Sequence, residues 1–89
     1  MELTELRQLL NTHHQRATYG AIAAVVGGIA KGIGQRLGAR NHLNSWAVNE
    51  NTKFPTGYAP AELHPNFLDN AHVIDNCQEL LEWIQQHGG

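Results

Sequence analysis

The chain has 89 residues, of which 42% are hydrophobic and 16% are charged, and its formal net charge is −2. This length and composition predict one small globular domain and exclude a disordered or fibrous chain. The single cysteine, Cys77, excludes an intramolecular disulfide, and the longest apolar run, residues 21–30, is too short for a membrane span. The first residues lack the basic region of a secretory signal, so we expect a cytoplasmic protein.

The charges are distributed unevenly along the chain. All six basic residues lie between positions 7 and 53, where the net charge is +5, whereas residues 54–89 contain five acids and no Lys or Arg. This polarity can create a basic face that attracts phosphates. It can also arise when charges segregate by chance on a solvated surface, and the sequence leaves both interpretations open.

The first half of the chain predicts three helices. Leucines at helical spacing indicate an amphipathic helix over Leu3–His14, and a second helix over Tyr19–Val26 follows Thr18, which is a suitable N-cap. Gly27 and Gly28 end this second helix. A third helix is expected over Ala30–Leu37.

The third helix combines an apolar face with a basic one. Ile33 and Leu37 are four residues apart and predict the inner face, whereas the outer positions are Lys31, Gly32, Gln35 and Arg36, with Arg40 just beyond. A short basic helix after a glycine turn is typical of a helix-turn-helix that binds DNA, where cations contact phosphates and an amide can contact a base edge. Three cations on one helix also occur on ordinary solvated faces.

The second half predicts a β-hairpin and a last helix. Ser45–Asn49 alternates like a half-buried strand, residues 50–53 are typical of a turn, and Phe54–Tyr58 is expected to be the returning strand. Ala59–Asp69 is expected to be irregular, with a helical turn at Ala61–His64. Asp75 or Asn76 then caps a last helix, whose predicted inner face is Cys77, Leu80, Leu81 and Ile84.

No motif in the chain predicts catalysis or a cofactor. The glycines of residues 20–38 lack the lysine and hydroxyl residue that end a phosphate-binding loop, and His13 and His14 are adjacent, so they cannot easily face one metal ion. Cys77 lies on the apolar stripe of the last helix, which favours packing over reactivity. We therefore expect no enzyme, metal or cofactor.

Three segments resemble a known DNA-repair family. TYGAIAAVVGG at Thr18–Gly28, AKGIG at Ala30–Gly34 and SWAVN…PTGY within Ser45–Tyr58 resemble the C-terminal winged-helix domain of alkylguanine-DNA alkyltransferases, and more closely the non-catalytic alkyltransferase-like proteins. The resemblance covers about residues 17–58. It implies that Tyr19 helps to rotate a nucleotide out of the duplex and that Lys31 replaces the family's helical arginine.

The nucleophile motif of that family is absent. The family has Pro-Cys-His-Arg, or Pro-Trp-His-Arg in the alkyltransferase-like proteins, where this chain has Asn44-Ser45-Trp46-Ala47. Alkyl transfer to a thiolate is therefore excluded at this position. The resemblance implies that Ser45, Trp46 and Tyr58 line what remains of the base pocket, although Tyr58 can equally be read as a core aromatic.

Together these features predict an α+β winged-helix domain over residues 1–89, with a helix-turn-helix, a β-hairpin wing and flanking N- and C-terminal helices. We expect a non-enzymatic protein that binds double-stranded DNA and recognises damaged or alkylated bases. The residues expected to contact DNA are Tyr19, Lys31, Gly32, Gln35, Arg36 and Arg40. The alternative is a protein-interaction module that contacts its partner through the acidic C-terminal half with Trp83, or through Phe54–Tyr58.

Overall fold

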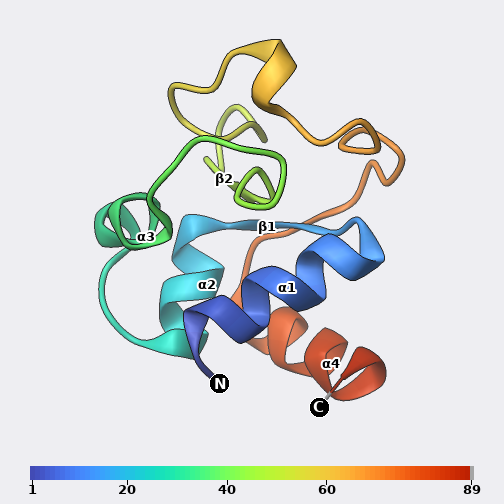
Figure 1. Ribbon diagram of the computed structural model, residues 1–89. Coiled ribbons are helices and arrows are strands. Elements are labelled where there is room, and N and C mark those ends of the chain that lie inside the picture. Colours follow the sequence, from blue (N-terminus) through green and yellow to red (C-terminus); the bar gives the residue numbers. More distant parts are fainter. Residues whose placement is uncertain (89) are drawn as a thin grey trace.

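The computed structural model describes residues 1–88, so Gly89, the last residue of the predicted domain, lies outside the described part. The helices and strands follow one another as α1 (Leu3–His13), β1 (Arg16–Thr18), α2 (Tyr19–Val26), α3 (Ala30–Leu37), β2 (Ala47–Val48), the 3-10 helix η1 (Pro60–Glu62), β3 (Val73–Ile74) and α4 (Cys77–His87). In Figure 1, α1, α2 and α4 lie below the strands, and most of the chain between α3 and β3 lies above them.

The predicted β-hairpin wing is wrong. The sheet has three strands in the order β2-β1-β3, and both pairings are parallel. β2 pairs with β1, with Ala17 opposite Ala47, and Ala17 is also opposite Ile74 of β3. The domain is therefore a small α/β domain with a parallel sheet and four α-helices, not a winged helix with a hairpin.

Phe54–Tyr58, the expected returning strand, forms turns instead. Lys53 has φ 65° and Gly57 has φ 79°, so the backbone leaves the extended region at both positions. The Lys53 N–H donates to the Asn49 carbonyl at 2.8 Å, which closes a tight turn directly after β2. The alternation at Ser45–Asn49 correctly indicated a strand, but its partner is β1, which lies 30 residues earlier between two helices.

The helices follow local signals closely. α2 and α3 have the predicted bounds, and the Thr18 hydroxyl accepts a hydrogen bond from the Ala21 N–H at 3.2 Å, as expected of an N-cap. Gly27 has φ 91°, a value that glycine adopts without strain, and it ends α2. α4 begins after Asn76, whose side chain accepts from the Glu79 N–H at 2.8 Å.

The core lies between the helices and the sheet, and it draws on every α-helix. Its most buried large side chains include Leu6 and Leu10 of α1, Ile22, Ile33 and Trp46. The expected inner face of α4 is only partly correct: Leu80 and Ile84 are buried and Cys77 is half-buried, but Leu81 is 42% exposed. Among residues 1–88, no helix has the length and apolarity needed to cross a bilayer.

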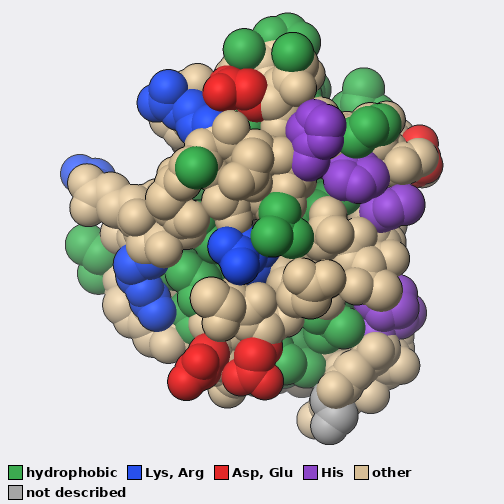
Figure 2. Space-filling view, in the orientation of Figure 1, with side chains coloured by type: hydrophobic (Ala, Val, Ile, Leu, Met, Phe, Trp, Pro, Cys, Tyr) green, Lys and Arg blue, Asp and Glu red, His purple; other side chains and the backbone are tan. Residues whose placement is uncertain are grey.

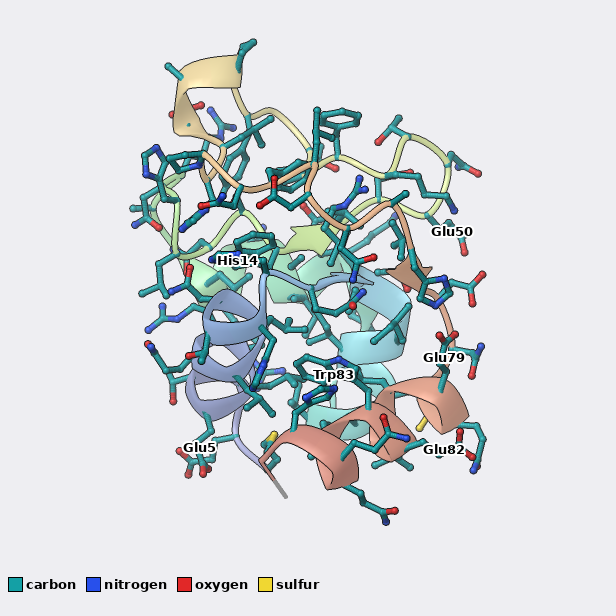
Figure 3. The ribbon with its side chains drawn as sticks, turned by 90° about the vertical axis from the view of Figure 1, so that its right-hand side faces the viewer. Glu5, His14, Glu50, Glu79, Glu82 and Trp83 are labelled. Atoms are coloured by element: carbon teal, nitrogen blue, oxygen red, sulfur yellow. The ribbon has the colours of Figure 1, made fainter. Side chains whose placement is uncertain are left out.

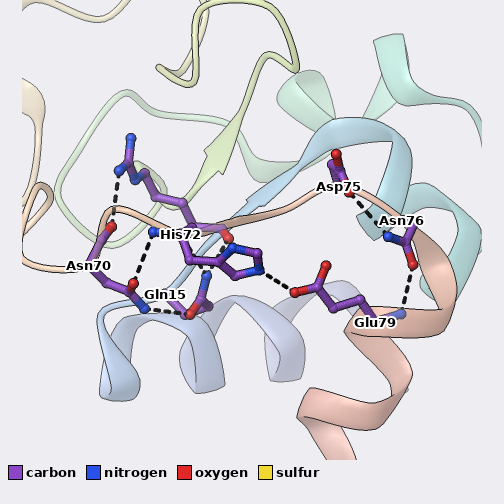
Figure 4. Close-up of polar contacts among 7 residues, drawn as sticks. Gln15, Asn70, His72, Asp75, Asn76 and Glu79 are labelled. Atoms are coloured by element: carbon purple, nitrogen blue, oxygen red, sulfur yellow. Dashed lines mark hydrogen bonds and ion pairs between the residues drawn. The ribbon is translucent and has the colours of Figure 1, made fainter.

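A polar network fastens the start of β1 to the chain just before β3. The Gln15 amide nitrogen donates to the Arg16 carbonyl and to the His72 carbonyl, and its oxygen accepts from the Asn70 amide at 2.7 Å (Figure 4). His72 in turn pairs with Glu79 of α4. Because Gln15 is buried, these bonds satisfy polar groups that water cannot reach.

Candidate nucleic-acid interface

A cleft of about 570 Å³ lies between α3 and the turn that contains Thr56 and Tyr58. Its lining consists of Tyr19, Ala30, Lys31, Gly34, Gln35, Leu37, Gly38, Arg40, Asn49, Thr56 and Tyr58. Figure 2 shows an indentation in the outline between α3 and the loops above it, with Lys or Arg side chains on both sides. The segment Thr18–Arg40 therefore contributes most of one surface cavity.

The α3 wall of the cleft combines a cation, an amide and open backbone. Lys31 and Gln35 are four residues apart, so they lie on one face of α3, and both are exposed. Gly34 lies between these two residues in the sequence, and a Cβ added there would project into open space. Among residues 1–88, no hydrogen bond or ion pair holds the Lys31 ammonium, so it can turn toward a bound group.

The opposite wall is held in place by Tyr19 and Gly57. The Tyr19 hydroxyl accepts a hydrogen bond from the Thr56 N–H at 3.0 Å, which joins the start of α2 to this turn. Gly57 has φ 79°, and a Cβ there would lie 2.9 Å from Nη2 of Arg40. Arg40 therefore packs directly on the Gly57 backbone, and a residue with a Cβ there would be strained by its positive φ and would have to displace the guanidinium.

Tyr58 is half-buried, and the groups around it act on the pKa of its phenol in opposite directions. Burial raises the pKa of its phenol above the usual 10.0, and the neighbouring Tyr19 and Glu62 act in the same direction. The Asn41 backbone N–H and the Arg40 guanidinium lower the same pKa. The phenol is therefore neutral at physiological pH and can donate a hydrogen bond into the cleft.

The structure brings together four of the six residues expected to contact DNA. Tyr19, Lys31, Gln35 and Arg40 line the cleft, but Arg36 and Gly32 do not. Nη1 of Arg36 donates to the Gly27 carbonyl at 2.7 Å, so this side chain spans the turn between α2 and α3. Gly32 is half-buried beside Ile29.

Ser45 and Trp46 lie in the interior, away from Tyr58 and the cleft. Ser45 is fully buried, and its hydroxyl donates to the His42 carbonyl at 2.8 Å. Trp46 is 1% exposed, and its indole N–H donates to Oδ1 of Asn11 at 2.8 Å. Of the three residues expected to form a base pocket, only Tyr58 lines the cleft.

Sequence reasoning missed two polar cleft residues and the side chain that supports α3. Asn49 and Thr56 line the cleft, and their only sequence signal is that Asn49 directly precedes the predicted turn and Thr56 lies in the expected returning strand. Asn44 is buried, and its amide nitrogen donates to the carbonyls of Leu37 and Ala39 at 3.1 and 2.7 Å. Its Oδ1 accepts from Arg7 of α1, which holds the C-terminal end of α3 against α1.

The cations divide between surface and interior. Arg16 is 5% exposed and donates to the carbonyls of Lys53 and Asn70, while its guanidinium lies 4.9 Å from the Phe67 ring centroid. Burial lowers the pKa of Arg16 from its ordinary value. Arg16 and Arg7 thus serve the fold, and the positive charge beside the cleft comes from Lys31 and Arg40, while Arg36 of α3 reaches across the turn to Gly27.

In the described part of the chain, no three His, Cys, Asp or Glu side chains are grouped to hold a metal ion. Comparisons with protein-family models, with curated proteins and with solved structures found no match for this chain.

Proposed function

We propose that the protein binds double-stranded DNA without chemical turnover, with α3 as the element that approaches the groove. The observation that carries this proposal is the joint lining of one cleft by two phenols and two cations: Tyr19, Tyr58, Lys31 and Arg40. Cations beside such a cleft suit the phosphate backbone, which supplies most of the affinity of DNA-binding proteins. Glycines on α3 permit a close backbone approach.

The cleft suits a single base turned out of the duplex. Its volume of about 570 Å³ falls in the range of small-molecule sites, roughly 300–1,000 Å³, and two aromatic rings line it. Flipped bases are held by stacking and by hydrogen bonds to their polar edges, which Gln35, Asn49 and the Tyr58 hydroxyl can supply. Recognition of a damaged or alkylated base, as in the alkyltransferase-like proteins that the sequence resembles, is the specific form of this proposal.

The residues that line the cleft favour a protein that binds DNA without catalysing a reaction on it. Among the described residues, no Cys, His, Asp or Glu lines the cleft, so a thiolate nucleophile and an imidazole or carboxylate base are lacking there. The single thiol, Cys77, is in the first turn of α4. A free thiol without a disulfide partner also agrees with our proposal that the protein works in the cytoplasm.

The decisive measurement is affinity for a labelled duplex at two salt concentrations, with and without an alkylguanine. Lys31→Glu should weaken binding at least about tenfold at low salt, because a phosphate contact is replaced by repulsion. The double variant Gln85→Glu/Gln86→Glu is the matched control: it changes the net charge equally, but on exposed positions of α4. Equal affinity for Lys31→Glu and the natural protein would refute the proposal.

Protein docking remains the alternative function, supported by exposed apolar side chains beside Phe67. Phe54 is 41% exposed with its ring 5.4 Å from that of Phe67, and Leu68 is 67% exposed. Trp83, by contrast, is half-buried and packs against both His13 and His87 on the side of α4 that faces α1 (Figure 3). Retention on a DNA column favours the first function, and passage through it with capture of a protein partner favours the second.

A further inference from the structure

Three histidines from distant parts of the chain converge beside Trp46. His14 follows α1, His42 lies between α3 and β2, and His64 follows η1. The ring of His64 lies 4.9 Å from that of His14, 5.9 Å from that of His42 and 5.0 Å from that of Trp46, measured between centroids. Figure 3 places His14 above the end of α1, facing the loops. We call these three residues the histidine cluster.

The geometry at His64 requires a neutral ring. The backbone N–H of Asn66 donates to Nδ1 of His64 at 3.0 Å, so this nitrogen must carry a lone pair. A proton on Nδ1 would place two N–H groups against each other and would add a cation beside two further histidines. Burial, reinforced by His14 and His42, lowers the pKa of His64, and Asp69 alone opposes them.

The histidine cluster fastens residues 59–66 to the rest of the domain. Within residues 1–88, two hydrogen bonds join this segment to the chain before it: the His64 N–H donates to the Ser45 hydroxyl, and Nε2 of His42 lies 3.2 Å from the Ala61 carbonyl oxygen. The first uses the His64 backbone and only the second uses an imidazole, so a proton on His64 acts on this attachment through its ring, which loses the Asn66 N–H bond and places a charge beside His14 and His42. Apart from these bonds, the half-buried Leu63 packs on the core, and an open hollow of about 480 Å³ is lined by Arg40–Leu43 together with Ala61 and Glu62.

The 59–66 segment also borders the cleft. It begins directly after Tyr58, and Glu62, which accepts a hydrogen bond from the Ala59 N–H at 2.6 Å, lies close enough to influence the Tyr58 phenol. At its other end Phe67 is buried against Trp46, with ring centroids 5.8 Å apart. The segment is therefore held firmly at its C-terminal end and by the histidines in its middle.

We infer that the histidine cluster is a proton-sensitive latch, which holds residues 59–66 in place while His64 is neutral and releases them when the cluster takes up protons. Release leaves Phe67 anchored and loosens the chain between it and Tyr58, so one wall of the cleft becomes less ordered in mild acid. The latch acts on the segment whatever the cleft binds, and it does not depend on the proposed DNA binding.

The test is amide hydrogen exchange by NMR on the full chain, in steps from about pH 7.5 down to about pH 4.5, because the pKa of His64 lies below the ordinary histidine value. We expect the protection factors of His64 and Asn66 to fall at least about tenfold relative to that of Gly27, whose N–H is bonded within α2. If the protection factor of Gly27 fell in parallel, the whole domain would be unfolding. If no protection factor fell, protonation would have no effect on the segment. Either result overturns the latch.

His64→Gln provides the second arm, because an amide oxygen can accept the Asn66 N–H at every pH. In this variant the fall in protection at Asn66 should disappear, whereas the control His72→Gln, an exposed histidine outside the cluster, should respond like the natural protein. An undiminished pH response in His64→Gln contradicts the inference. If that variant does not fold, the residue-by-residue comparison in the natural protein decides.

Discussion

The hydroxyl of Tyr19 accepts a hydrogen bond from the backbone N–H of Thr56 across 37 residues of sequence, at 3.0 Å. This bond links the first residue of α2 to the turn that replaces the expected second strand, and both partners line the cleft. The Tyr19 side chain therefore both lines the cleft and fixes the Thr56 turn on its other side. This hydrogen bond and the packing of Arg40 on Gly57 join the two sides of the cleft.

Tyr19→Phe should remove the hydrogen bond to the Thr56 N–H and keep the aromatic ring. We expect a loss of about 0.5–1.5 kcal/mol in the free energy of unfolding, the usual contribution of one hydrogen bond, measured by urea denaturation. Duplex affinity should fall as well, because the Thr56 turn loses its attachment. An unchanged denaturation midpoint would show that the bond contributes nothing in solution.

Gly57→Ala should destabilise the fold by roughly 1–2 kcal/mol, since φ 79° is unfavourable for a residue with a Cβ and that Cβ would also displace Arg40. Gly34→Ala is the matched control within the same cleft. Because Gly34 lies inside α3 with open space around its Cα, alanine there should raise stability by about 0.5–1 kcal/mol. The two substitutions should thus move the denaturation midpoint in opposite directions, and a shift in the same direction contradicts this interpretation.

Asn44→Ala should cost about 1–3 kcal/mol, because the partly buried bonds to the carbonyls of Leu37 and Ala39 are lost and Arg7 loses its acceptor. The effect should concentrate at the end of α3, seen as lower protection of amides in its last turn. Asn51→Ala is the control, since Asn51 is exposed and its side chain makes no hydrogen bond to residues 1–88; it should change stability by less than about 0.5 kcal/mol.

The stability of the domain should fall in mild acid. The pKa of His64 is lowered in the folded chain, chiefly by burial, so the unfolded chain binds this proton at a higher pH. The contribution of His64 is then complete above its ordinary pKa of 6.5 and is lost as the pH drops through the lowered value. Urea midpoints measured across this range should decline, and His64→Gln should flatten the decline. Parallel curves for the two proteins would exclude His64 as the cause.

The sequence by itself determined the helices and little of the sheet. The bounds of α2 and α3 were predicted correctly because their signals are local: Thr18 caps one end of α2, and two glycines separate it from α3. The Asn76 cap of α4 was visible for the same reason. The strands have only two or three residues each, and strand β1 between two helices left no periodic pattern to read.

Only the tertiary structure decided which strands pair and which basic side chains point into the interior or toward the cleft. Parallel strands bond segments that are far apart along the chain, so a strand's partner cannot be read from its neighbours, and Ser45–Asn49 was assigned to the wrong one. Likewise, a list of basic residues does not show that Arg16 points inward while Lys31 faces the cleft. Burial of Ser45 and Trp46 follows from the same long-range packing, which places in the core two side chains that the family resemblance implies for a base pocket.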